Sequence, residues 1–205
     1  MTGLFITLEG GDGTGKSTQS ALIGEWFTAK GREVVFTREP GGTDLGNELR
    51  EIVLHSRGHI APRAEALLYA ADRAHHVATV VRPALERGAV VIQDRYLDSS
   101  VAYQGAGRVL DPDEVRQVSM WATEGLVPDV TVVLDLDPAI SRDRLNAANK
   151  QFDRLEAEAL EFHTRVRDAY LTMASAEPTR FLVIDATLDR DVIRDAIIAR
   201  LDQLS

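Results

Sequence analysis

The glycine-rich segment at residues 10–17 limits the possible folds of this chain more than any other feature of the sequence. It reads Gly-Gly-Asp-Gly-Thr-Gly-Lys-Ser and fits the pattern G-x-x-x-x-G-K-[ST] at every position. An apolar run, Leu4–Glu9, comes directly before it, and an amphipathic stretch with an apolar stripe within residues 22–27 follows it. Backbone N–H groups of such a loop, together with the positive end of the next helix, can surround a phosphate. We therefore expect a strand, a phosphate-binding loop and a helix in this order.

The residues of this loop have individual roles in binding a nucleotide. Lys16 can reach the β- and γ-phosphates, and the hydroxyl of Ser17 can ligate Mg²⁺. A glycine-rich turn could match the pattern by chance, but the position between a strand and an amphipathic helix favours the phosphate loop. We expect ATP and Mg²⁺ as cofactors, with the nucleotide bound by Gly10, Gly11, Asp12, Gly13, Thr14, Gly15, Lys16, Ser17 and Thr18.

Apolar runs alternate with helical segments along the whole chain, which indicates an α/β fold with a parallel sheet. Asp-Pro pairs at residues 111–112 and 137–138 are typical helix starts. The length of 205 residues suits one domain, and no linker or internal repeat divides the chain. We predict a single domain over residues 1–205, with helices on both faces of a five-stranded sheet of the P-loop NTPase type. The expected strands are Leu4–Glu9, Glu33–Thr37, Ala89–Asp94, Val130–Asp135 and Arg180–Asp185.

The composition argues against several classes of protein. The net charge of −9 argues against broad binding to a nucleic-acid backbone, which needs a basic surface. The absence of cysteine excludes disulfides and cysteine-ligated zinc. The longest apolar run, Ala66–Ala71, is far shorter than the ~20 residues that span a bilayer, and the start of the chain lacks the pattern of a secretion signal. We expect a cytoplasmic protein that binds neither nucleic acid nor membrane.

Other motifs narrow the class of phosphate-loop protein. A GTPase needs a guanine-reading Asn-Lys-x-Asp, but residues 149–153 read Asn-Lys-Gln-Phe-Asp, with the aspartate one position late and no strand before it. A motor ATPase needs adjacent Asp-Glu after an apolar strand, whereas the fourth expected strand ends in Leu134-Asp135-Leu136. These comparisons favour a kinase that acts on a nucleotide or another small molecule.

Asp94 and Arg95 follow the third expected strand and are candidates for catalysis. A carboxylate at the carboxyl end of a strand beside the phosphate loop can hold Mg²⁺ or its waters, and the adjacent arginine can clamp the acceptor phosphate. An Asp-Arg pair is more often a surface salt bridge, but the apolar run Val90–Gln93 before it favours a functional role.

Five groups of residues follow one another along the chain: Glu9–Ser17 (EGGDGTGKS), Thr37–Thr43 (TREPGGT), Leu68–Arg73 (LYAADR), Asp94–Tyr96 with Ser99–Gly105 (DRY and SSVAYQG) and Asp153–Glu156 (DRLE). Together they make the chain resemble the thymidylate kinase family almost from end to end. The resemblance implies an enzyme that transfers the γ-phosphoryl group of Mg-ATP to dTMP, giving dTDP for dTTP synthesis, and that forms a homodimer. Two alternatives stay open at this point: another nucleoside monophosphate or deoxynucleoside kinase, and an ATP-binding module with little turnover.

The resemblance also implies how the sugar and base of dTMP are bound. Asp12 is expected to hydrogen-bond the sugar 3′-hydroxyl, and Tyr103 to crowd the 2′ position and so disfavour ribonucleotides. Tyr69 is expected to stack on the thymine ring, and Arg73, one helical turn later, to donate to a base carbonyl. The expected readers of the base edge, again four residues apart, are Ser100 and Gln104.

The acceptor phosphate is expected to lie among arginines. The resemblance places Arg38, Arg50 and Arg95 around it, where guanidinium groups match the phosphate oxygens. Glu39 is expected to line the same site, beside a turn that Pro40 stiffens.

A short lid is expected over about residues 142–156, and it departs from the pattern of the family. Some members carry an arginine in the phosphate loop at the position of Gly13, and others carry an arginine-rich lid before Asp-Arg-[Ile/Leu]-Glu. Here the loop has no arginine, and the segment before Asp153 offers only Lys150, flanked by Arg142, Arg144 and Arg154. Either one of these cations closes over ATP and acts in transfer, with Arg154 the first candidate and Lys150 the second, or the lid is shortened and turnover is low. The other expected catalytic residues are Lys16, Asp94 and Arg95.

Some conspicuous residues suggest ordinary structural roles. Trp26 and Trp121 lie in helical stripes and are expected in the core. The pair His75-His76 has no further ligand at metal-binding spacing, so an exposed helix face is expected. The acidic stretch Glu156–Glu161 is expected to be the solvated face of a helix.

Overall fold

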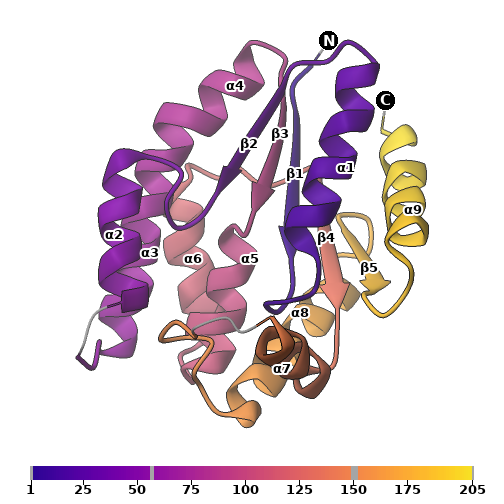
Figure 1. The fold of residues 1–205 in the computed structure, drawn as a ribbon. Coiled ribbons are helices and arrows are strands. Elements are labelled where there is room, and N and C mark those ends of the chain that lie inside the picture. The colour runs from indigo at the N-terminus through magenta and orange to yellow at the C-terminus, as the bar shows by residue number, and fades with distance from the viewer. Residues whose placement is uncertain (1, 56–57, 149–151, 205) are drawn as a thin grey trace.

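One five-stranded parallel sheet forms the centre of the molecule in the computed structural model, which describes residues 2–55, 58–148 and 152–204. The strand order is β2-β3-β1-β4-β5 (Figure 1). The predicted α/β class is confirmed, and each predicted strand agrees with the observed one to within one residue at either end. The strands are β1 (Leu4–Glu9), β2 (Val34–Arg38), β3 (Val90–Asp94), β4 (Val130–Asp135) and β5 (Phe181–Asp185).

Helices cover both faces of the sheet (Figure 1). α1 (Lys16–Ala29) and α9 (Arg190–Asp202) pack together on one face, and α7 (Pro138–Ala147) lies beside the loop that follows β1. Two π-helical segments, η1 (Val77–Val81) and η2 (Val101–Gly107), continue the helices before them. The helices on the opposite side are α2 (Asp44–His55), α3 (Pro62–His76), α4 (Arg82–Glu86), α5 (Leu97–Ser100), α6 (Pro112–Ala122) and α8 (Leu160–Ala176).

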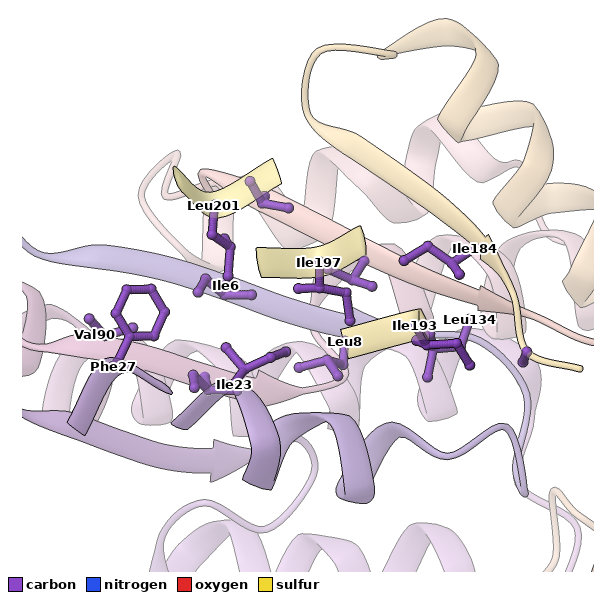
Figure 2. Close-up of a cluster of buried hydrophobic side chains, with 14 of the residues drawn as sticks. Ile6, Leu8, Ile23, Phe27, Val90, Leu134, Ile184, Ile193, Ile197 and Leu201 are labelled. Atoms are coloured by element: carbon purple, nitrogen blue, oxygen red, sulfur yellow. The ribbon is translucent and has the colours of Figure 1, made fainter. Parts of the chain in front are cut away.

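The side chains of β1 alternate between two cores, as the period of a strand requires. Ile6 and Leu8 face α1 and α9, where they pack with Ile23 and Ile197 (Figure 2). Phe5 points to the other face and belongs to a second core under η1 and α4. Full burial of each such side chain contributes about 1.5–3 kcal/mol, so both faces hold β1 in place. The loop after β1 therefore starts from a rigid position at the carboxyl edge of the sheet.

Three expectations about individual residues are wrong. Trp121 is 83% exposed, because the buried face of α6 carries Val115 and Ser119 and Trp121 points away from it. His76 is buried, unlike His75, because its ring is hydrogen-bonded inside the protein. Glu156 is also buried; it precedes α8, and its carboxylate accepts from the Asp153 backbone N–H at 3.1 Å. The other tryptophan, Trp26, packs half-buried against the core, as expected.

Candidate active site

The phosphate loop at residues 10–17 joins β1 to α1. Gly10 lies so close to β4 that a Cβ atom there would be 2.5 Å from the Leu134 carbonyl oxygen, and Gly15 precedes α1 with a left-handed φ of 97°. These are positions that glycine can occupy without strain. The Lys16 ammonium is held inside the loop, 2.7 Å from the Gly11 carbonyl oxygen. Burial lowers its pKa, and the nearby Arg95 adds to the effect.

Three cavities border this loop, and two of them share several charged lining residues. The first, which we call the loop cavity, is lined on one side by residues 12, 13 and 15–18 and on the other by the ends of β2 and β3. Ser17 and Thr18 are exposed at its wall, and Lys16 also lines it. Its remaining charged lining residues are Asp12, Arg38, Glu39, Arg50, Asp94 and Arg95.

The second, the aromatic cavity, lies among α3, α5, η2 and the segment before α8. Tyr69, Tyr96 and Tyr103 supply its aromatic walls. Asp12, Glu39, Arg50 and Arg95 line both cavities, so the two spaces share a charged boundary. The structure thus brings together here nearly all residues that were predicted to bind the acceptor: Asp12, Glu39, Arg50, Tyr69, Arg73, Arg95, Ser100, Tyr103 and Gln104. The remaining one, Arg38, lines the loop cavity alone.

Arg95 lies on the boundary between the two cavities. Its backbone has a φ of 66°, a left-handed conformation that costs a non-glycine residue about 1–3 kcal/mol and is often found at functional sites. Its guanidinium is 2.9 Å from Asp12 and 3.3 Å from the Ser99 hydroxyl, and it stacks over the ring of Tyr103. These contacts fix a cationic group where the loop and aromatic cavities meet.

Asp94, just before it, has an unsatisfied oxygen. Its Oδ1 is buried without a hydrogen-bond partner among the described residues, and the residue lines the loop cavity together with Ser17. An orphaned carboxylate oxygen and an exposed hydroxyl in one cavity are suitable donors for a hard cation such as Mg²⁺, which needs few protein ligands. No cluster of three or more metal-ligating side chains occurs in the described part of the chain.

Arg73 is buried in a network that the sequence did not predict. Its guanidinium donates to Glu39 at 2.8 Å, to Ser119 at 3.0 Å and to Ser100 at 3.0 Å. The second oxygen of Glu39 is 2.8 Å from Nδ1 of His76. Arg73 therefore has a fixed orientation at the wall of the aromatic cavity, and His76 helps to hold it through Glu39.

Glu9 at the end of β1 is a second functional candidate whose contacts the sequence did not reveal. Its carboxylate accepts from the Tyr96 backbone N–H at 2.8 Å, from the Ser99 hydroxyl at 2.5 Å and from the Tyr170 hydroxyl at 2.7 Å. Burial raises the pKa of Glu9 to about 7, and the negative charge of Asp98 contributes. Glu9 therefore links the start of the phosphate loop to the segment that carries Arg95.

The cations expected in the lid lie at different places. Arg144 on α7 reaches the phosphate loop, with Nη1 3.4 Å from the Gly13 carbonyl oxygen. Arg154 does not line the loop cavity; it donates to Glu65 at 2.5 Å and to the Val53 carbonyl at 2.8 Å. Arg142 donates to the backbone of Glu158, and Lys150 lies outside the described residues.

Within the described ranges, no helix is both long enough and apolar enough to cross a membrane.

Comparison with known proteins gives one consistent result. The family model described as thymidylate kinase matches residues 8–197. A thymidylate kinase of Clavibacter sepedonicus is 73% identical over 98% of this chain and 95% of its own length. One of Leifsonia xyli subsp. xyli is 71% identical over the same shares of the two chains. The crystal structure of thymidylate kinase from Ehrlichia chaffeensis superposes with a TM-score of 0.81 at 31% identity, covering 98% of this chain and all of that one.

Proposed function

The chain belongs to the thymidylate kinase family and is an enzyme that phosphorylates dTMP to dTDP with ATP, and from this premise we propose which residues bind the two nucleotides. The observation that carries the proposal is the ion pair of Asp12 and Arg95, 2.9 Å apart, which lines both cavities. The triphosphate of ATP occupies the loop cavity and dTMP the aromatic cavity. The acceptor phosphate then lies beside Arg95, facing the phosphate loop.

On the donor side, the phosphate loop and its helix bind the triphosphate. Backbone N–H groups of residues 10–18 surround its oxygens, and Lys16 leaves the loop carbonyls to pair with the β- and γ-phosphates. Ser17 and Asp94 would hold the Mg²⁺ ion, and the orphaned Asp94 oxygen supports this assignment. When bound, the ion supplies positive charge that offsets the charge of the phosphates.

On the acceptor side, aromatic residues and polar or charged residues bind different parts of dTMP. Tyr69 stacks on the thymine ring, while Arg73, Ser100 and Gln104 read its edge. Tyr103 lies against the sugar, and Asp12 binds the 3′-hydroxyl. The acceptor phosphate is held by Arg38, Arg50 and Arg95, with Glu39 fixing the arginine beside the base.

The chemistry of transfer requires little beyond positioning and charge. Phosphoryl transfer passes through a loose transition state with negative charge spread over the moving group. Lys16 contacts the moving group from the ATP side and Arg95 from the dTMP side, so both charges are in position before the reaction starts. A cation of the lid segment completes the set: the sequence favours Arg154, with Lys150 second, whereas the contact of Arg144 with the Gly13 carbonyl favours Arg144.

The Arg73→Ala variant tests the placement of the base. We expect kcat/KM for dTMP to fall roughly tenfold to a hundredfold, because a hydrogen bond involving a charged donor contributes about 1.5–3 kcal/mol. KM for ATP should stay nearly unchanged. Arg63→Ala is the matched control, since Arg63 lies on the same helix but pairs on the surface with Glu114. Equal loss for both substrates would show a structural role for Arg73 instead.

We also propose a homodimer that forms through the face made by α3 and α6. Leu67 on α3 and Trp121 on α6 are 59% and 83% exposed, and the two helices pack side by side. Large apolar side chains gathered on one face mark a surface that another protein covers.

A cytoplasmic location, as expected from the sequence, is also proposed; cell fractionation with an antibody to the chain tests it.

A further inference from the structure

Glu65, in the first turn of α3, joins three parts of the acceptor site that are distant in the sequence. Its side chain is fully buried. One carboxylate oxygen accepts from Gln104 Nε2 at 2.9 Å and from Arg108 Nε at 3.3 Å, and the other accepts from Arg154 at 2.5 Å. Two guanidinium groups therefore balance the charge of this buried carboxylate.

The charge of Glu65 determines which way the Gln104 amide points. An ionised carboxylate only accepts hydrogen bonds, so the group of Gln104 that contacts it must be the NH₂. The amide carbonyl is then the end of Gln104 that remains for a ligand of the aromatic cavity, which this residue lines. Because the two ends of an amide have nearly the same shape, nothing but hydrogen-bond partners selects between them.

This polarity matches thymine and opposes cytosine. Thymine presents an N3–H donor beside a carbonyl acceptor at C4, whereas cytosine presents an N3 acceptor beside an amino donor. A carbonyl at Gln104 and a guanidinium at Arg73 complement the thymine edge and place acceptor against acceptor and donor against donor for cytosine. A site built in this way rejects the mismatched base because polar groups are left unpaired.

We propose that Glu65 is a positioning residue that sets the hydrogen-bond polarity of the base site and thereby selects thymine over cytosine. The inference rests on the proposed placement of the base against Arg73 and Gln104. The second oxygen of Glu65 holds Arg154, whose neighbours Asp153 and Leu155 line the same cavity. The same carboxylate therefore also fixes the segment 153–156 beside the base.

The first test is Glu65→Gln, which keeps the shape of the side chain and removes its charge. The amide of Gln104 can then turn either way, so we expect the ratio of kcat/KM for dTMP to that for dCMP to fall about tenfold or more. The change should arise mainly in KM for the nucleoside monophosphates, with KM for ATP unchanged. The matched control is Glu114→Gln, because Glu114 pairs with Arg63 on the surface and should leave the ratio as it is.

A swapped pair separates this role from a merely structural one. In the double variant Glu65→Gln with Gln104→Glu, residue 65 donates and the carboxylate at 104 can only accept. The cavity again meets an acceptor, and the pair of residues 65 and 104 still carries one negative charge. We expect the dTMP to dCMP ratio to return to within about threefold of wild type. This variant also carries the test if Glu65→Gln alone does not fold.

Gln104→Ala distinguishes the possible failures. If it leaves the ratio at the wild-type value, Gln104 does not read the base, and the proposed base placement and the role of Glu65 are both overturned. If it lowers the ratio but Glu65→Gln does not, only the role of Glu65 is overturned. A swapped variant with the same ratio as Gln104→Ala also overturns that role. A loss restored by the swap supports it.

Discussion

Lys16 is the residue to which we assign the most direct role in phosphoryl transfer. Its ammonium rests on the Gly11 carbonyl, a position from which it can reach the phosphates of a bound nucleotide. We expect Lys16→Met to keep the fold and to lower kcat by far more than tenfold, since removing a charge aimed at the transition state costs several kcal/mol. A steady-state assay and a thermal melt check both parts. A variant with more than about a tenth of the wild-type kcat would disprove the transition-state role.

The raised pKa of Glu9 predicts that the stability of the folded protein depends on pH. Its pKa is about 7 in the folded protein, above the ordinary 4.5, so between these values the folded state keeps a proton that the unfolded chain has lost. Stability from this group is therefore present at low pH and declines as pH rises through the window, by at most about 1.4 kcal/mol per pH unit.

Glu9→Gln mimics the protonated form and removes this slope. The difference in unfolding free energy between the variant and wild type should therefore shift in favour of the variant from pH 5 to pH 7, in chemical denaturation at both values. Asp72, whose pKa burial raises to about 6, contributes equally to both proteins and cancels in the difference. A difference that does not change with pH would contradict the assignment.

At the scale of elements, the lid arginines make distinct predictions. Arg144 on α7 lies at the phosphate loop, whereas Arg154 pairs with Glu65, so the two should affect different steps. We expect Arg144→Ala to lower the single-turnover rate at saturating Mg-ATP by tenfold or more, and Arg154→Ala to raise KM for dTMP. Stopped-flow measurements separate the two. If only Arg154→Ala lowers the single-turnover rate, Arg154 is the cation that acts in transfer, as the sequence predicts.

The sheet and much of the site could be predicted from the sequence because their signals are local. The strands are continuous apolar runs, and the phosphate loop is one contiguous motif. His76 and Glu65 could not be found in this way. Their partners, Glu39 and Gln104, are 37 and 39 residues away, and only the fold makes a buried polar residue recognisable. The prediction for Trp121 is wrong because helical spacing alone does not tell which face of a helix packs against the rest of the protein.

At the scale of the whole molecule, the exposed face of α3 and α6 predicts association. Trp121→Glu places a charge on the face proposed to join two chains, and we expect it to shift the protein from dimer to monomer in sedimentation velocity runs. Phe36→Glu, at an exposed aromatic residue on β2, is the matched control and should leave the sedimentation coefficient unchanged. A wild-type protein that sediments as a monomer at micromolar concentration would contradict the proposal.

Selective phosphorylation of dTMP, as we propose it, requires an acceptor cavity that reads thymine next to a loop that binds ATP. ADP release by the purified protein tests this arrangement, measured with Mg-ATP and each of a panel of nucleoside monophosphates and with Lys16→Met as the blank. We predict that kcat/KM for dTMP exceeds that for dCMP, dGMP and dAMP by a hundredfold or more, as a site with matched hydrogen bonds allows. Equal turnover of dTMP and dCMP, or faster turnover of a purine nucleotide, would contradict it.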